Sequence, residues 1–182
     1  MLIQRTVRDM MIPLANYSVV GPESTLRDAV LSLRKSYCEL EAGLCTEAGP
    51  RTVLVVDKKE NLVGILDFQS ILKVLIPEIA GGLSGKLAAL GISVTFAEAD
   101  AHSLDESKAH FHARVMKNAE TRVKDIMLKV RGTIQSESDI QEALKLIFRN
   151  KITTLPVYEG DELIGVVRDA DLFLAVADIL MD

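Results

Sequence analysis

The feature that most constrains the fold of this chain is an internal repeat. From Ile152 to Phe173, two short apolar runs flank the polar turn Glu159–Glu162 and an apolar helical pattern follows, which predicts a β-hairpin leading directly into a helix. The stretch from Thr52 to Leu75 shows the same order. Three pairs of residues match across the two stretches: Gly64 with Gly165, Leu62 with Leu163, and Val56 with Val157. The repeat predicts two similar structural units.

The similarity extends upstream of the hairpins. The segments Thr6-Val-Arg-Asp-Met-Met11 and Arg122-Val-Lys-Asp-Ile-Met127 open the two units, and each predicts that its Asp caps a short helical turn. Extended residues and an amphipathic helix follow in both. Capping boxes are predicted at the starts of these helices: Thr25 with Asp28, and Ser138 with Gln141. Each unit of about 60 residues is marginal alone, so we expect the two to pack sheet against sheet.

Two segments interrupt the repeat. Residues 38–50 lengthen the link between helix and hairpin in the first unit, and their glycines and Pro50 predict a loop. Residues 78–120 separate the units, and their second half, where Ser103 and Glu106 form a capping-box pattern, predicts a helix. We therefore divide the chain into domain 1 (1–77), a linker with a helical insert (78–120) and domain 2 (121–182).

The composition excludes several classes of partner. The net charge is −5 and the basic residues are scattered, so no nucleic-acid surface is predicted. The N-terminus lacks the apolar core of a signal peptide, and no uncharged apolar stretch reaches the roughly 18 residues of a membrane span. We expect a cytoplasmic protein without membrane contact. Cys38 and Cys45 are the only cysteines; two reduced thiols are favoured, and a local disulfide or a redox role remains open.

Two units of β-α-β-β-α order, each opening with V-x-D-h-M and ending with G-h-h-x-x-x-x-L, resemble a tandem pair of cystathionine β-synthase (CBS) domains, or Bateman module. The resemblance covers roughly residues 6–76 and 121–181. It implies an α/β fold in which the repeats pack as a pseudo-two-fold pair, here with a helical insert between them. It also implies a homodimer, because such modules tend to pair into disks.

The resemblance further implies a regulatory ligand, an adenosine nucleotide of the AMP, ADP or ATP class, in the cleft between the repeats. Asp171 matches the carboxylate that accepts hydrogen bonds from both ribose hydroxyls, which an ionised Asp can do. Arg168 replaces the family's Ser or Thr and offers a guanidinium to a phosphate. The adenine pocket would comprise Thr133, Ile134, Thr154, Leu155, Pro156 and Val157. The alternative is that Asp171 only caps the last helix while Arg168 pairs with a nearby carboxylate.

The first unit carries a weaker version of this site. Ser70 stands where the ribose-binding carboxylate would be, and Asp67 stands at the hydroxyl position. Ser70 offers one uncharged hydrogen bond, and Asp67 would repel a phosphate. We therefore expect one ligand per chain, held mainly by the second unit.

Other chemistry finds little support. The glycine-rich stretch Gly81–Leu87 is not a phosphate-binding Walker A loop, which needs Gly where Ala80 stands and Ser or Thr where Leu87 stands, so a linker is favoured. His110 and His112 are two residues apart and point away from each other on a helix, so no metal site is predicted; in an extended segment they would share a face and, with Asp100, could bind a metal. All three histidines (with His102) lie in the insert, away from the repeat clefts, so no catalytic centre is predicted, and no required cofactor either. The alternative to nucleotide sensing is a ligand-free interaction or dimerisation module whose insert contacts a partner. The sequence names neither the preferred nucleotide nor an effector protein.

Overall fold

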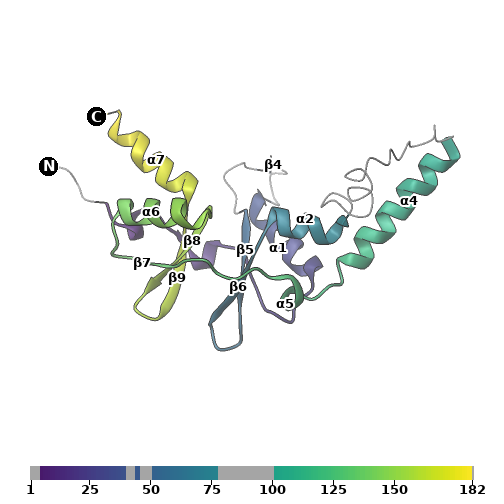
Figure 1. Cartoon of the computed structure of the whole chain (residues 1–182), viewed down its shortest axis with the longest axis horizontal. Helices are drawn as coiled ribbons and strands as arrows, with labels where there is room; N and C mark the ends of the chain where they lie inside the picture. Colours follow the sequence, from purple (N-terminus) through teal and green to yellow (C-terminus); the bar gives the residue numbers. More distant parts are fainter. Residues whose placement is uncertain (1–4, 40–43, 46–50, 78–100, 182) are drawn as a thin grey trace, which may run out of the picture.

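The structure, a computed structural model, describes residues 5–39, 44–45, 51–77 and 101–181 (Figure 1). For residues 37–39, 44–45 and 101–107 only the backbone is described. Most of the loop predicted at 38–50, and the first half of the segment predicted at 78–120, lie outside these ranges. The repeat predicted from the sequence is present as two α/β units, each with its own small sheet and helices.

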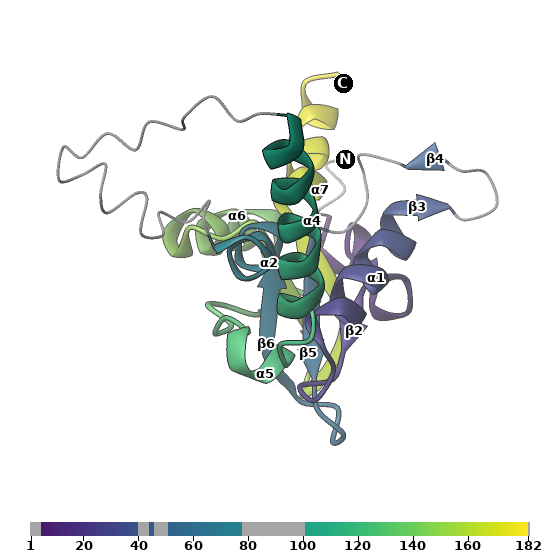
Figure 2. The same cartoon turned by 90° about the vertical axis from the view of Figure 1, so that its right-hand side faces the viewer.

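The first unit and its opening segment comprise η1 (Val7–Asp9), β1 (Ile12–Pro13), η2 (Leu14–Asn16), β2 (Val19–Val20), α1 (Leu26–Tyr37), β3 (Cys38–Glu39), β4 (Leu44–Cys45), β5 (Thr52–Val56), β6 (Leu62–Asp67) and α2 (Phe68–Leu75). The second comprises α5 (Val123–Ile126), β7 (Ile134–Gln135), α6 (Ile140–Asn150), β8 (Thr154–Glu159), β9 (Glu162–Arg168) and α7 (Asp169–Ile179). Helix α4 (Ala101–Asn118) precedes the second unit in the sequence, but it lies beside α2 of the first unit and projects from that end of the molecule (Figures 1 and 2).

Both predicted hairpins form, and each supplies two neighbouring strands of a sheet. One sheet has the order β2-β5-β6 and the other β1-β9-β8-β7. Strands β5–β6 and β8–β9 pair antiparallel, whereas β2 and β7 each run parallel to the first hairpin strand. A third, two-stranded sheet pairs β3 with β4 and places Cys38 opposite Cys45 in the backbone register.

The opening segment of each unit packs against the sheet of the other unit. Strand β1 of the first unit pairs with β9 of the second, with Ile12 opposite Val166. Reciprocally, Leu128 exchanges backbone hydrogen bonds of 2.8 and 3.0 Å with Ile65 on β6 of the first unit. This reciprocal exchange relates the two units by a pseudo-two-fold and ties them into one body.

The cores follow the same exchange. Val7, from the opening segment of the first unit, is fully buried in the core of the second, in the same cluster as Ile147 and Leu155. Val123, from the opening segment of the second unit, is fully buried in the core of the first. A third cluster, which includes Tyr17, joins the two sheets. The division of the chain at residues 77 and 121 stays a prediction. Each core also contains one residue from the other side of that division, Val7 in the second unit and Val123 in the first.

Three predictions, one about which hairpin residues correspond and two about which residues cap helices, were wrong by one to three residues. Gly64 pairs with Val55 and Gly165 pairs with Val157, so Val55 rather than Val56 is the structural counterpart of Val157. The opening turns begin after Thr6 and Arg122, and Asp9 lies inside its turn, where it accepts from the backbone of Thr6 at 2.7 Å. Helix α6 is capped by Asp139, which accepts from the Glu142 amide at 2.8 Å, not by Ser138. The predicted box of Thr25 and Asp28 is confirmed.

In the part of the chain that the structure describes, no helix combines the length and apolar character that crossing a bilayer requires.

Candidate functional site

The corner between β9 and α7 holds the two residues that the sequence singled out. Arg168 ends β9 and is the N-cap of α7, and Asp171 is the third residue of that helix. The Asp171 carboxylate accepts from the Arg168 backbone amide at 3.0 Å, from its Nε at 2.9 Å and from its Nη2 at 2.6 Å. Both side chains are largely covered, with 15% and 13% of their surface exposed. Asp171 thus caps α7 and pairs with Arg168 at once.

This ion pair sets the electrostatics of the corner. The hydrogen bonds that its guanidinium donates to Asp171, reinforced by the charge of that carboxylate, hold the pKa of Arg168 above its ordinary value, so the guanidinium stays charged. Within the pair, Oδ2 already accepts two hydrogen bonds and Oδ1 accepts one. A carboxylate has about four lone-pair positions, so Asp171 as it stands can take one further donor. Accepting two vicinal hydroxyls would require the Arg168 side chain to move away.

A pocket of about 890 Å³ lies beside this pair. Its polar walls are Arg51, Lys151, Thr153, Thr154 and the turn from Arg168 to Asp171, and its apolar walls come from α6 and α7. A second pocket of about 420 Å³ lies between the two units and shares Arg51 and the run from Lys151 to Thr154 with the first. The two pockets therefore adjoin, and the volume of each falls in the size range of small-molecule sites.

The residues predicted to surround an adenine divide between these pockets and the core. Thr154 and Pro156 line the pocket between the units. Leu155 and Val157 are instead fully buried in the core, because successive strand residues point to opposite faces of the sheet. Ile134 is likewise buried in that core, and Thr133 lies at the surface beside it. Of the predicted set, the structure brings Thr154, Pro156, Arg168 and Asp171 to the pockets.

The corresponding corner of the first unit is closed by its own hydrogen bonds. Asp67 caps α2 by accepting from the Ser70 amide at 2.7 Å. The Ser70 hydroxyl bonds back to Asp67, at 3.0 Å from its amide and 2.9 Å from its carbonyl oxygen. Asp67 lines the pocket between the units, whereas Ser70 lines neither pocket described above. Both side chains serve the helix start, which leaves little for a ligand.

Tyr17 is a residue of the site that the sequence interpretation passed over. It is buried between the sheets, its hydroxyl bonds with the Thr52 hydroxyl, and burial raises its pKa. Thr154, Arg168 and Asp171 also influence the pKa of this hydroxyl, so Tyr17 packs next to the Arg168–Asp171 corner although it lines neither pocket. The sequence shows an aromatic residue in the extended segment before β2, but only the packing of the two units reveals that this residue lies between their sheets.

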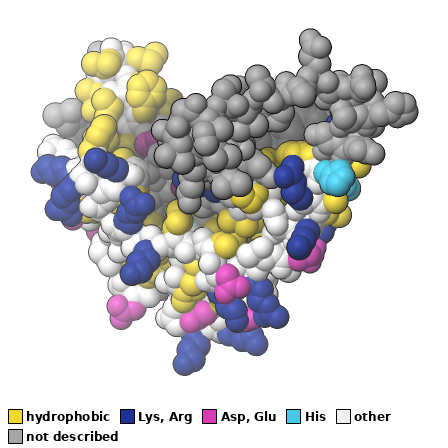
Figure 3. All heavy atoms as spheres, turned by 45° about the vertical axis from the view of Figure 1, so that its right-hand side comes forward, with side chains coloured by type: hydrophobic (Ala, Val, Ile, Leu, Met, Phe, Trp, Pro, Cys, Tyr) yellow, Lys and Arg dark blue, Asp and Glu magenta, His cyan; other side chains and the backbone are white. Residues whose placement is uncertain are grey.

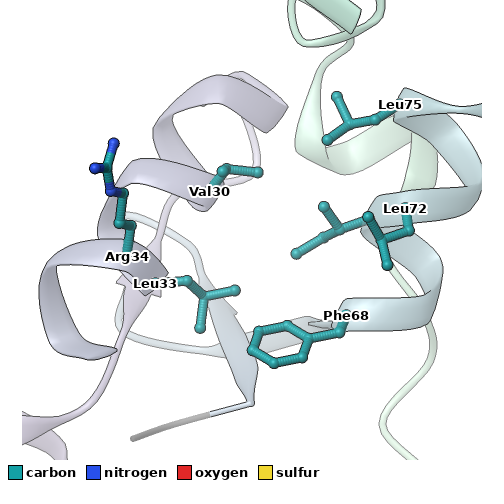
Figure 4. Close-up of a pocket in the computed structure, with 7 residues that line it drawn as sticks. Val30, Leu33, Arg34, Phe68, Leu72 and Leu75 are labelled. Atoms are coloured by element: carbon teal, nitrogen blue, oxygen red, sulfur yellow. The ribbon is translucent and has the colours of Figure 1, made fainter. Parts of the chain in front are cut away.

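Each unit also carries an apolar helical face. On the first, Phe68, Leu72 and Leu75 of α2 face Val30 and Leu33 of α1 across a groove of about 370 Å³, with the Arg34 guanidinium pointing away (Figure 4). On the second, hydrophobic side chains gather on α7 where it projects from the body (Figure 3). The most exposed of these large side chains on α6 and α7 are Phe148, Phe173, Leu174 and Ile179, each more than 60% accessible.

The described residues contain no group of three or more His, Cys, Asp or Glu side chains placed to hold a metal ion. His110 and His112 are exposed on α4, and the side chain of His102 lies outside the described set.

Comparisons with known proteins identify the fold. A family model, the CBS domain, matches residues 7–77 and again residues 123–178. A comparison with curated proteins found no match. Among solved structures, CBSX2 from Arabidopsis thaliana is 20% identical with a TM-score of 0.61, covering 97% of each chain. CBSX2 in complex with AMP, at 19% identity, has the same TM-score over 96% of this chain and 97% of that one.

A more distant neighbour is the cytosolic domain of the Mg²⁺ channel MgtE in complex with ATP. It is 18% identical with a TM-score of 0.53, and the match covers 90% of this chain and 46% of that one. At such identities the likeness shows the shared fold. Because the family model matches both halves of the internal repeat, the chain belongs to the CBS domain family, as a tandem pair of CBS domains.

Proposed function

We propose that this chain is a regulatory module that binds an adenosine nucleotide in the cleft between its two CBS repeats, mainly through the second repeat. The observation that carries the proposal is the position of Asp171. Its carboxylate lies at the start of α7, beside adjoining pockets of about 890 and 420 Å³ whose walls include Thr154 and Pro156. The AMP complex of CBSX2 and the ATP complex of the MgtE domain, both of this fold, support the ligand class.

Binding in this site proceeds by exchange of partners. The ribose hydroxyls take the place of the Arg168 guanidinium on Asp171, and the released guanidinium then turns to the phosphate of the same ligand. The Asp171 carboxylate and the Arg168 guanidinium thus each exchange one charged hydrogen bond for another, so neither group is left without a partner. The first repeat contributes little, because Asp67 and Ser70 bond to one another.

The module acts without catalysis and transmits occupancy of the cleft as a change in the placement of its repeats. The ligand shifts this equilibrium only as far as it binds one arrangement more tightly than the other. Core residues from each opening segment lie in the opposite repeat, so a displacement of one repeat is felt by the other. We place the module in the cytoplasm, where nucleotides are abundant.

The helical faces support assembly into a homodimer. Phe148 of α6 and Phe173 and Ile179 of α7 expose 77%, 70% and 62% of their surface. A helix that is apolar on several sides is normally covered. A second copy of the chain, presenting the same faces, is the occupant that we propose.

The alternative function is an interaction module with an empty cleft. The closed Arg168–Asp171 pair favours it, since both groups are already satisfied without ligand. Calorimetric titration with adenosine, AMP, ADP, ATP and S-adenosylmethionine separates the two. Binding of at least one of them, lost in an Asp171 variant, supports the nucleotide sensor. Absence of binding by all five would leave the interaction module and direct the search to residues 78–120.

A further inference from the structure

The pocket between the two repeats has an unusual charge. Four cationic side chains line it, contributed by Arg51, Lys129, Arg131 and Lys151. Arg51 precedes β5 in the first repeat, and the other three belong to the second repeat, on either side of β7 and α6. The only carboxylate in the lining is Asp67, which is already engaged as the cap of α2. A pocket so lined attracts anions.

Some basic side chains on the surface of the two repeats have carboxylate partners. Arg8 pairs with Glu137 and Glu159, and Arg122 pairs with Glu23. By contrast, none of the four pocket cations forms an ion pair with any carboxylate among residues 5–36, 51–77 and 108–181. Like charges gathered without counter-charges repel one another, so their arrangement costs stability unless an anion binds.

Lys151 adds a second, independent observation. It follows the last residue of α6 with φ 52° and ψ 51°, the left-handed conformation that favours glycine at this position of a helix end. Its side chain lines both pockets. A glycine there would relieve the backbone but remove the charge. The backbone position thus favours glycine, while the pocket favours the ammonium group.

The pocket also has the right position relative to Asp171. It adjoins the larger pocket through Arg51 and the run from Lys151 to Thr154, and Asp171 lines that larger pocket. A nucleoside with its ribose on Asp171 can therefore extend its phosphates past Thr154 toward the four cations. A monophosphate has one such group to offer them, whereas a triphosphate has three.

We propose that Arg51, Lys129, Arg131 and Lys151 form a subsite for a phosphate chain, so that the cleft selects nucleoside di- and triphosphates over the monophosphate. The inference rests on the proposed function, which places the nucleoside at Asp171. It also names the contact that couples the repeats: Arg51 is the cation that the first repeat supplies, so a bound phosphate chain bridges the two repeats.

Calorimetric titration with adenosine, AMP, ADP, ATP and inorganic triphosphate, in buffer without Mg²⁺, tests the subsite. We expect ATP to bind at least about tenfold more tightly than AMP, because each added phosphate gains charged hydrogen bonds. The preference falls as salt is raised, because the four side chains are exposed. Arg131→Gln, which alters only the pocket between the repeats, reduces the ratio of ATP to AMP affinity and leaves adenosine binding unchanged; Lys151→Gln reduces the same ratio.

The position of Lys151 allows a sharper variant. Lys151→Gly should raise the melting temperature by about 2–4 °C, because it relieves the left-handed backbone, yet lower ATP affinity as much as Lys151→Gln does. A loss of binding together with a gain of stability cannot come from unfolding. Lys145→Gln, on the same helix but outside both pockets, is the matched control and should leave the ratio unchanged.

The outcomes of these titrations test the phosphate-chain subsite separately from the proposed nucleotide-binding function. Equal affinity for AMP and ATP, or an ATP preference that survives all of the charge-removing variants, overturns the subsite while leaving nucleotide sensing intact. Binding of inorganic triphosphate that depends on the four cations, with no binding of adenosine ligands, supports the subsite and overturns the proposed function. If no nucleotide and no triphosphate binds, both are overturned.

Discussion

Gly165 of β9 lies directly against the main chain of Ile12 in β1. A Cβ atom on Gly165 would stand 2.4 Å from the carbonyl oxygen of Ile12, well inside van der Waals contact. The matching glycine of the first repeat, Gly64, faces the opening segment of the second repeat through a side chain, with Met127 Sδ 2.6 Å from the corresponding position. Both glycines thus provide room for the exchanged segments.

This difference predicts unequal effects of the same substitution. Gly165→Ala should destabilise the protein by about 2–3 kcal/mol, because the backbone of β1 must move or detach. Gly64→Ala should cost less than about 1 kcal/mol, since the Met127 side chain can change rotamer and alanine restricts the unfolded chain. Urea unfolding followed by far-ultraviolet circular dichroism measures both. Equal costs would mean that the two exchanged segments pack alike.

The ribose role of Asp171 predicts a loss of binding. Asp171→Asn keeps the size of the side chain and its ability to cap α7, but removes the charge that would hold two hydroxyls. We expect affinity for adenosine and its nucleotides to fall by about 2–3 kcal/mol. Isothermal titration calorimetry gives the affinities, with Asp161→Asn at the tip of the β8–β9 hairpin as the control. Unchanged affinity in Asp171→Asn would place the ribose elsewhere.

The Arg168–Asp171 pair predicts opposite effects on two ligands. In Arg168→Ala the carboxylate has no guanidinium to release, so adenosine should bind more tightly than to the parent protein. A nucleotide loses the guanidinium that would contact its phosphate and should bind more weakly. The same titrations, run with adenosine and AMP, check this. A parallel loss for both ligands would show that Arg168 acts only by shaping the corner.

The cap of α1 predicts part of the acid sensitivity. Hydrogen bonds from the Thr25 backbone and hydroxyl lower the pKa of Asp28 below its ordinary 3.8. The folded-state pKa is thus lower than the unfolded one, so this carboxylate stabilises the fold above pH 3.8 and the contribution is lost as the pH falls below it. Asp28→Asn should lower stability at pH 7 and flatten its decline toward pH 3. Chemical unfolding at several pH values measures this, and an unaltered decline would contradict it.

The exposed helical face of the second repeat predicts an oligomeric state. If two copies cover each other's α6 and α7, Phe148→Glu or Phe173→Glu should convert the protein to a monomer, because a charge cannot be buried there without a partner. Sedimentation velocity over a range of concentrations reports the state. Phe111→Glu on α4, whose ring is also exposed, serves as the control. A parent protein that is monomeric throughout would remove the proposed dimer.

The sequence determined the local architecture because its signals are local. Polar turns between apolar runs produced both hairpins, and the repeat of Gly64 and Gly165 identified two copies of one unit. The capping pair of Thr25 and Asp28 formed as expected, since it depends on residues three apart. The sequence did not identify Asp139 as the N-cap of α6, because neighbouring residues such as Ser138 can also cap a helix and the backbone geometry selects one of them.

The tertiary structure decided which surfaces meet. Val7 and Val123 look alike in their own segments, yet each is buried in the opposite repeat, which no local pattern specifies. Tyr17 gains its place between the sheets, and Arg51 its place in the cleft, only when two distant stretches pack together. The pairing of Arg168 with Asp171 required the turn into α7 to bring both to one corner. Local sequence thus specified each unit, whereas long-range packing of the two units created the site.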